Sequence, residues 1–165
     1  MAEYRATVLI VYYSRTGNTR KMADEVAAGV VQAGGLAEVH PVEEFSIAQL
    51  NAADALIVGS PTYFGHPAAE IQQFFDRSVS LHGKLENKVG AAFASSHNIG
   101  GGNETTVLHI LESMLVHGMI VQGIPEGDHF GPVSVGSLNR RAASQCRQLG
   151  QRTVDLCRRL RPSDR

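Results

Sequence analysis

Apolar runs and amphipathic segments alternate along the chain. The apolar runs hold hydrophobic residues at consecutive positions, which is typical of parallel strands buried on both faces. They predict strands at 7–13, 36–42, 55–59, 88–94 and 119–122, the last resuming at 133–135 after an excursion. Apolar positions spaced three and four residues apart predict helices at 20–33, 67–78, 104–117 and 139–160. This order predicts a single α/β domain over residues 1–165, a doubly wound five-stranded parallel sheet with helices on both faces.

The loop after the first strand has the composition of a phosphate cradle. In open α/β sheets, ligands bind beyond the carboxyl ends of the strands, and this loop leads directly into a helix. Backbone N–H groups, hydroxyls and the positive end of the helix dipole would meet there. The loop lacks a Walker A lysine, so neutral donors would hold the phosphate. The alternative is a polar turn that only caps the helix. The candidate residues are Ser14, Arg15, Thr16, Gly17, Asn18 and Thr19.

Two further loops at the same predicted edge suit a flat ring. The loop at 60–67 carries two adjacent aromatics between prolines, which suggests a wall for ring packing, although the aromatics could also fold into the core. The loop at 95–103 carries three successive glycines, which suit close approach of backbone amides to a ligand or simply flexibility. Together the three loops predict flavin mononucleotide (FMN). The added candidates are Pro61, Thr62, Tyr63, Phe64, Gly65, Ser95, Ser96, His97, Asn98, Gly100, Gly101 and Gly102.

Four motifs carry a resemblance to known flavoproteins. The turn at 14–19 resembles the flavodoxin phosphate loop, and the sequence at 61–65 resembles the P-T-R-F-G loop of the WrbA-type NAD(P)H:quinone oxidoreductases. The sequence at 100–104 is similar to their G-G-G-Q-E, and that at 117–119 matches their H-G-M. The resemblance covers nearly the whole chain and implies the flavodoxin-like fold.

The resemblance also implies an activity. A noncovalent FMN would take two electrons from NADH or NADPH and pass them to a quinone-like small molecule, in a homodimer or homotetramer. His117 would lie near the ring as the one candidate catalytic residue, while His117 followed by Gly118 is equally typical of a helix C-cap. Arg15 would screen the phosphate or touch the 2′-phosphate of NADPH, or point to solvent. The chain departs from the family in having no tryptophan and a short connection at 42–53.

Charge and composition exclude several partners. The net charge of −1 argues against binding to nucleic acid, and no apolar run approaches membrane-spanning length. We therefore expect a cytoplasmic protein that binds neither nucleic acid nor a membrane. No His, Cys, Asp and Glu set has metal-ligand spacing. Cys146 and Cys157 fall on one predicted helix, too far apart along it for a disulfide, and are expected to be reduced thiols.

Other classes built on this fold fit less well. A flavodoxin-type electron carrier that docks to redox partners is the main alternative, but steered docking favours one dominant charge sign, and this chain is nearly neutral. A receiver domain needs a carboxylate after the third strand, where Gly59 and Ser60 stand, and a low-molecular-weight phosphatase needs a cysteine in the first loop. The electron acceptor, the choice between NADH and NADPH and the number of subunits stay open.

Overall fold

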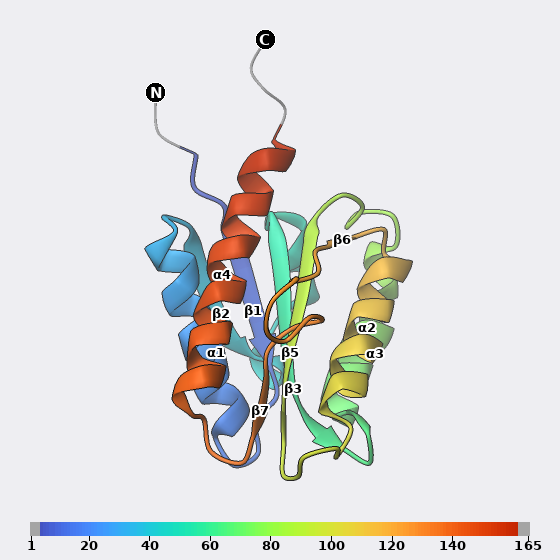
Figure 1. The fold of residues 1–165 in the computed structure, drawn as a ribbon. Coiled ribbons are helices and arrows are strands. Elements are labelled where there is room, and N and C mark those ends of the chain that lie inside the picture. The colour runs from blue at the N-terminus through green and yellow to red at the C-terminus, as the bar shows by residue number, and fades with distance from the viewer. Residues whose placement is uncertain (1–3, 162–165) are drawn as a thin grey trace.

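A parallel sheet runs through the centre of the molecule, with helices on both faces (Figure 1). The computed structural model describes residues 4–161. The strand order is β2-β1-β3-β5-β6, and all neighbours along this path pair in parallel. This confirms the predicted fold class. The strands on the path are β1 (Thr7–Tyr12), β2 (Leu36–Pro41), β3 (Ala55–Tyr63), β5 (Val89–Ser96) and β6 (Ile120–Val121).

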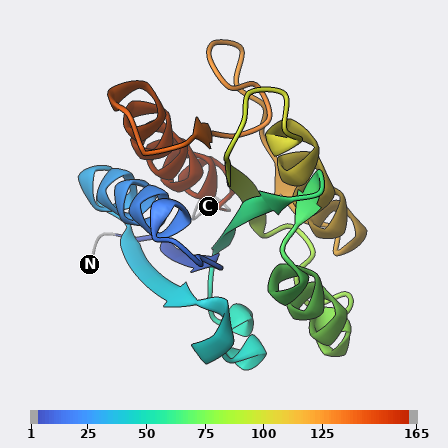
Figure 2. The same cartoon turned by 90° about the horizontal axis from the view of Figure 1, so that it is seen from below.

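Each face of the sheet has its own hydrophobic core. One core joins α1 (Asn18–Gln32) and α4 (Arg140–Leu160) to the sheet, and the other joins α2 (Ala69–Arg77) and α3 (Asn103–Val116) to it. The view from below shows the two helix pairs on opposite sides (Figure 2). Alternate residues of β1 enter alternate cores, as strand geometry requires: Val8 and Ile10 face α1 and α4, whereas Leu9 faces α2 and α3.

Two glycines let α1 and α4 pack closely. A Cβ on Gly29 would lie 2.0 Å from the carbonyl oxygen of Arg147, and one on Gly150 would lie 2.2 Å from that of Val26. Any larger residue at either position would therefore force the two backbones apart, which accounts for glycine in helix interiors where it otherwise lowers stability.

Two strands extend further than expected. β3 continues past Gly59 to Tyr63 and turns back into the short strand β4 (His66–Pro67), so the expected irregular loop at 60–67 is an antiparallel hairpin. β5 likewise runs through Ser96, so two residues assigned to the glycine loop lie in a strand. Proline usually ends a central strand because it lacks an N–H, but Pro61 stands near the end of β3, where it still pairs in register with Ser95.

The last strand of the sheet is split. β6 pairs with the start of β5, and β7 (Val133–Val135) pairs with its end, which confirms the predicted excursion between them. Gly131, at φ +147, brings the excursion against the middle of β5, since a Cβ on it would lie 2.1 Å from the carbonyl oxygen of Ala92.

The helix faces differ from expectation at their ends. Leu115 and Leu160 continue the apolar spacing of the helices predicted at 104–117 and 139–160, but they are 58% and 43% exposed because each lies in the last turn of its helix. The short connection at 42–53 contains two 3₁₀ helices, Val42–Glu44 and Ile47–Asn51. Within the described part of the chain, no helix is both long and apolar enough to cross a membrane.

Candidate functional site

Three predicted loops meet at the carboxyl edge of the sheet. This edge lies at the bottom of Figure 1 and faces the viewer in Figure 2. The turn after β1, the β3–β4 hairpin and the loop after β5 all lie there, since these strands are parallel neighbours. The structure therefore brings together all the predicted cofactor residues. The one predicted residue that it places elsewhere is His117.

The turn after β1 wraps around the hydroxyl of Ser14. Its Oγ accepts the N–H groups of Gly17 and Arg20, each at 3.2 Å, which leaves the hydroxyl proton free to point outward. Gly17 adopts a left-handed conformation at φ +96, and a Cβ there would meet nothing within 4 Å. Among residues 4–161, the amides of Thr16, Asn18 and Thr19 have no acceptor. Free amides at a helix N-terminus are suited to binding an anion.

The hydroxyl of Thr19 makes a contact inside the protein, whereas it was expected among the donors to a phosphate. It is only 2% exposed, and its Oγ1 lies 2.8 Å from the Oγ of Ser95, which is also buried. The hydroxyl pair connects the first turn of α1 to the end of β5. Both residues therefore hold the loops together through their side chains, which leaves the backbone N–H of Thr19 as its remaining donor.

A network of side chains fixes the loop after β5. The Ser96 hydroxyl donates to the carbonyl of Asn98 at 3.1 Å and accepts the amide of Asn103 at 3.0 Å. Asn103 also accepts the N–H of Glu104 through Oδ1 at 2.8 Å. Sequence reasoning missed Asn103, although asparagine at a helix start is a recognised signal. His97 is exposed, as is the backbone around Gly100.

The aromatics of the hairpin project away from the core. Tyr63 is 37% exposed, and Phe64 is fully exposed. Phe64 also has φ +50, which is unusual for a bulky residue and implies that neighbouring contacts impose it. Of the two expectations left open for this loop, the structure supports the exposed wall.

The glycine run has a reason inside the protein. A Cβ on Gly102 would lie 2.5 Å from the Cα of Gly65, so the two loops touch backbone to backbone. Gly100, at φ +68, faces open space. Position 102 requires glycine for close packing, and position 100 requires it for its backbone conformation. Plain flexibility therefore does not account for the glycine run.

His117 ends α3 at the opposite edge of the sheet, far from the three loops (Figure 1). Gly118 donates to the carbonyl of Leu115 at 2.9 Å and Met119 donates to that of Met114 at 3.1 Å, the pattern of a Schellman C-cap. The His117 Nε2 lies 2.7 Å from the Ser78 hydroxyl, which donates to a backbone carbonyl and so accepts from the imidazole. His117 thus fits the helix-cap interpretation. Within one chain, it does not lie near the three loops at which the flavin ring is expected.

The surroundings of His117 disfavour the charged form of its imidazole. Burial lowers the pKa of His117 first, and the neighbouring His82 lowers it further. The ring centroids of the two histidines lie 6.3 Å apart. Both effects disfavour a second proton, and the geometry at Ser78 makes Nε2 the hydrogen-bond donor.

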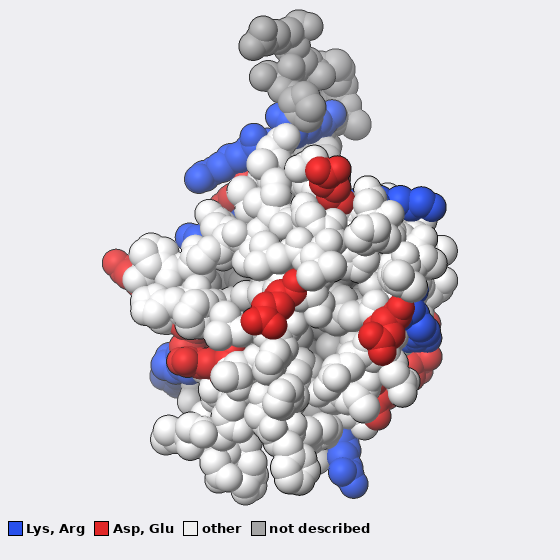
Figure 3. Space-filling model, turned by 90° about the vertical axis from the view of Figure 1, so that its right-hand side faces the viewer, with Lys and Arg blue, Asp and Glu red and all other residues white. Residues whose placement is uncertain are grey.

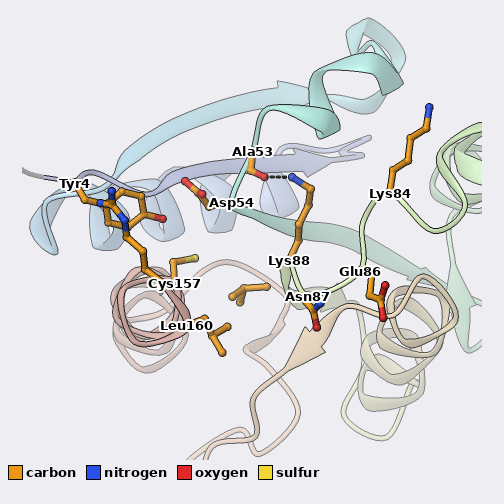
Figure 4. Close-up of a pocket in the computed structure, with 11 residues that line it drawn as sticks. Tyr4, Ala53, Asp54, Lys84, Glu86, Asn87, Lys88, Cys157 and Leu160 are labelled. Carbon is orange, nitrogen blue, oxygen red and sulfur yellow. Dashed lines mark hydrogen bonds between the residues drawn. The ribbon is translucent and has the colours of Figure 1, made fainter. Parts of the chain in front are cut away.

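A hollow of about 560 Å³ lies at the amino edge of the sheet, not at the loops (Figure 4). Two of the charged groups that line it, Asp54 and Lys88, have hydrogen-bond partners within the protein. Asp54 accepts the N–H of Thr7 at 2.8 Å, and the Lys88 ammonium donates to the carbonyls of Asn51 and Ala53. The presence of a hollow therefore does not by itself identify the cofactor site. Residues 4–161 also contain no cluster of three or more metal-binding side chains.

A parallel sheet in this order, with free amides in the turn after its first strand, is typical of a flavodoxin-like protein. The family model described as "Flavodoxin domain" matches residues 9–103, and the chain belongs to this family.

Relatives and solved structures agree with this assignment. The chain is 32% identical to an NAD(P)H dehydrogenase (quinone) of Archaeoglobus fulgidus, across 94% of this chain and 99% of that protein. It is 36% identical to a flavodoxin of Aquifex aeolicus, across 90% and 85% of the two chains. The crystal structure of a WrbA-like flavodoxin from Agrobacterium tumefaciens superposes with a TM-score of 0.83 at 27% identity, covering 94% of this chain and 99% of the other.

Proposed function

We propose that this protein is an FMN-dependent oxidoreductase that takes two electrons from NADH or NADPH and passes them to a quinone or a similar small molecule. The observation that carries the proposal is the cradle of free amides at the start of α1, next to exposed aromatics and a glycine loop on one edge. The similarity to proteins named NAD(P)H dehydrogenase (quinone) supports the choice of reaction.

The turn after β1 fits a phosphate group. The amides of Thr16, Asn18 and Thr19, with the hydroxyls of Ser14 and Thr16, would supply neutral donors at the positive end of the helix dipole. No carboxylate occurs between residues 14 and 19 to repel an anion. Arg15 is exposed beside the turn, where it would screen the phosphate charge.

The other two loops fit a flat, polar-edged ring. Tyr63 and Phe64 would pack against its face. The amides of Gly100 and Gly102 have no acceptor among the described residues and would donate to its carbonyl edge, where they would stabilise negative charge. When bound, FMN would supply the hydride and electron transfer, and the chain would bind and orient it.

Self-association forms part of the proposal, as a homodimer or homotetramer. Val79, Leu115 and Val116 are 71%, 58% and 74% exposed on the side formed by α2 and α3. Figure 3 shows this face as mostly uncharged, with separate acidic groups across its middle. Exposed apolar surface of this kind is typical of an interface. Light scattering on the purified protein tests it, and a monomer at all concentrations would contradict it.

An electron carrier of the flavodoxin type is the second candidate, because the similar Aquifex aeolicus protein is named flavodoxin. One experiment separates the two. The FMN-loaded protein is mixed anaerobically with NADPH or NADH while the visible flavin band is followed. Rapid bleaching supports the oxidoreductase. Bleaching by dithionite but by neither nucleotide supports the carrier, and failure to bind FMN contradicts both.

A further inference from the structure

The aromatic hairpin is fastened to α3 by contacts that do not involve the side chains of Tyr63 and Phe64. The hydroxyl of Thr105 lies 2.9 Å from the carbonyl oxygens of both Gly65 and Gly102. The ring of His66 stacks on that of His109, with centroids 4.6 Å apart and an interplanar angle of 11°. Thr105 and His109 lie one turn apart on α3 and so present both contacts from one side of the helix.

His66 connects the stack to the turn that carries Phe64. Its Nδ1 lies 2.9 Å from the carbonyl oxygen of Phe64, and because a carbonyl only accepts, Nδ1 carries the proton. This bond holds the turn in which Phe64 has φ +50. The Phe64 side chain is fully exposed and supplies no packing of its own. The unusual conformation must therefore be imposed through the backbone and through His66.

We propose that His109 and Thr105 are positioning residues for the aromatic wall. They act through His66 and Gly65 to hold Tyr63 and Phe64 out from the sheet edge in a fixed orientation. Neither residue belongs to the three loops assigned to the cofactor. The consequence for FMN affinity rests on the proposed function, whereas the ordering of the hairpin is a property of the protein alone.

The protein offers a clean reporter for this ordering. It contains no tryptophan, so Phe64→Trp introduces a single tryptophan, which can be excited selectively over the four tyrosines, at a position with free space around it. Time-resolved fluorescence anisotropy then measures local motion at the hairpin tip without any flavin. In this background we expect His109→Ala and Thr105→Val each to increase the amplitude of fast motion roughly twofold, since loop motions on the nanosecond scale are visible to this method. His109→Phe keeps a flat ring beneath His66 and should restore the parent value.

A matched control removes a histidine of similar surroundings elsewhere. His40 is half-buried and packs against the ring of Phe45 at 5.3 Å, but on β2 at the far side of the sheet. His40→Ala should leave the motion of the introduced tryptophan unchanged. Circular dichroism checks that each variant is folded, and if His109→Ala is not, the nearly isosteric Thr105→Val decides.

Flavin titration of the same substitutions in the unlabelled protein gives the second readout. We expect FMN to bind about 3- to 10-fold more weakly to His109→Ala and Thr105→Val, the range that loss of one ring stack gives, and normally to His109→Phe. If the parent protein does not bind FMN, the proposed function fails while the anisotropy comparison still decides the positioning role. Unchanged motion in both His109→Ala and Thr105→Val, or equal motion in His109→Ala and His109→Phe, would overturn the inference.

Discussion

The backbones of Gly65 and Gly102 touch across the candidate site, although 37 positions separate them in the chain. A Cβ on Gly102 would approach the Cα of Gly65 to 2.5 Å, closer than two carbon atoms can pack. The contact joins the aromatic hairpin to the start of α3. Two of the three loops of the site therefore form one unit, and the close contact between them requires that residue 102 have no side chain.

Gly102→Ala should destabilise the protein more than Gly100→Ala. Both glycines have positive φ, so both substitutions carry the same kind of backbone strain. Only Gly102 also has a backbone neighbour in the way. We expect the free energy of unfolding to fall by about 1–2 kcal/mol more for Gly102→Ala, as for other overpacked sites. Urea denaturation measures the difference, and equal losses would show that the loops can separate without cost.

Thr19 and Ser95 should be coupled energetically. Removing either hydroxyl leaves its buried partner unpaired, so Thr19→Val and Ser95→Ala should each lower the free energy of unfolding by about 1–2 kcal/mol. The double variant should lose less than the sum, because no unpaired hydroxyl remains. A double-mutant cycle by urea denaturation checks this, and strict additivity would count against a direct bond.

Ser14→Ala should weaken binding of FMN while leaving that of riboflavin unchanged. The Ser14 hydroxyl organises the turn by accepting two backbone N–H groups, and its own proton is free to donate to a phosphate. We expect about a tenfold higher dissociation constant for FMN, the usual effect of losing one hydrogen bond to a charged group. Riboflavin lacks the phosphate and serves as the internal comparison. Lys21→Ala, at an exposed position in the first turn of α1, is the control variant.

The side chain of His117 should titrate below the ordinary histidine value of about 6.5. Burial is the larger cause of the lowered pKa and His82 the smaller, so His82→Ala should raise the midpoint only in part. With a folded pKa below the unfolded one, the unfolded chain binds more protons between the two values. Stability should therefore fall as the pH drops through that interval. NMR titration of the imidazole measures the midpoint, and a value above 6.5 would contradict this account.

Much of the fold follows from local pattern. The strands were predicted because consecutive apolar residues are required wherever a parallel strand is covered on both faces, as in β1 and β5. The positions of the site loops followed from topology, since parallel strands end at one edge. Strand ends were less predictable, because Pro61 is a local signal for a break that pairing with Ser95 overrides.

The missing parts of the site are contacts between distant segments. Nothing near Thr19 in the sequence indicates that its hydroxyl pairs with Ser95, 76 positions away. The stack between His66 and His109 is equally invisible, because each histidine alone resembles a solvated side chain. His117 was predicted by resemblance to lie near the ring, whereas the direction of α3 carries it to the other edge.

The excursion between β6 and β7 shields the sheet from unwanted association. The split leaves the middle of β5 without a strand on its outer side, and exposed strand edges are common starting points for aggregation. Gly131 brings the chain directly against Ala92 at this gap, and Pro132 accepts the N–H of Ala94 at 3.0 Å. The protein thus covers this edge of its sheet with an irregular segment, which offers another chain no continuous row of backbone groups to pair with.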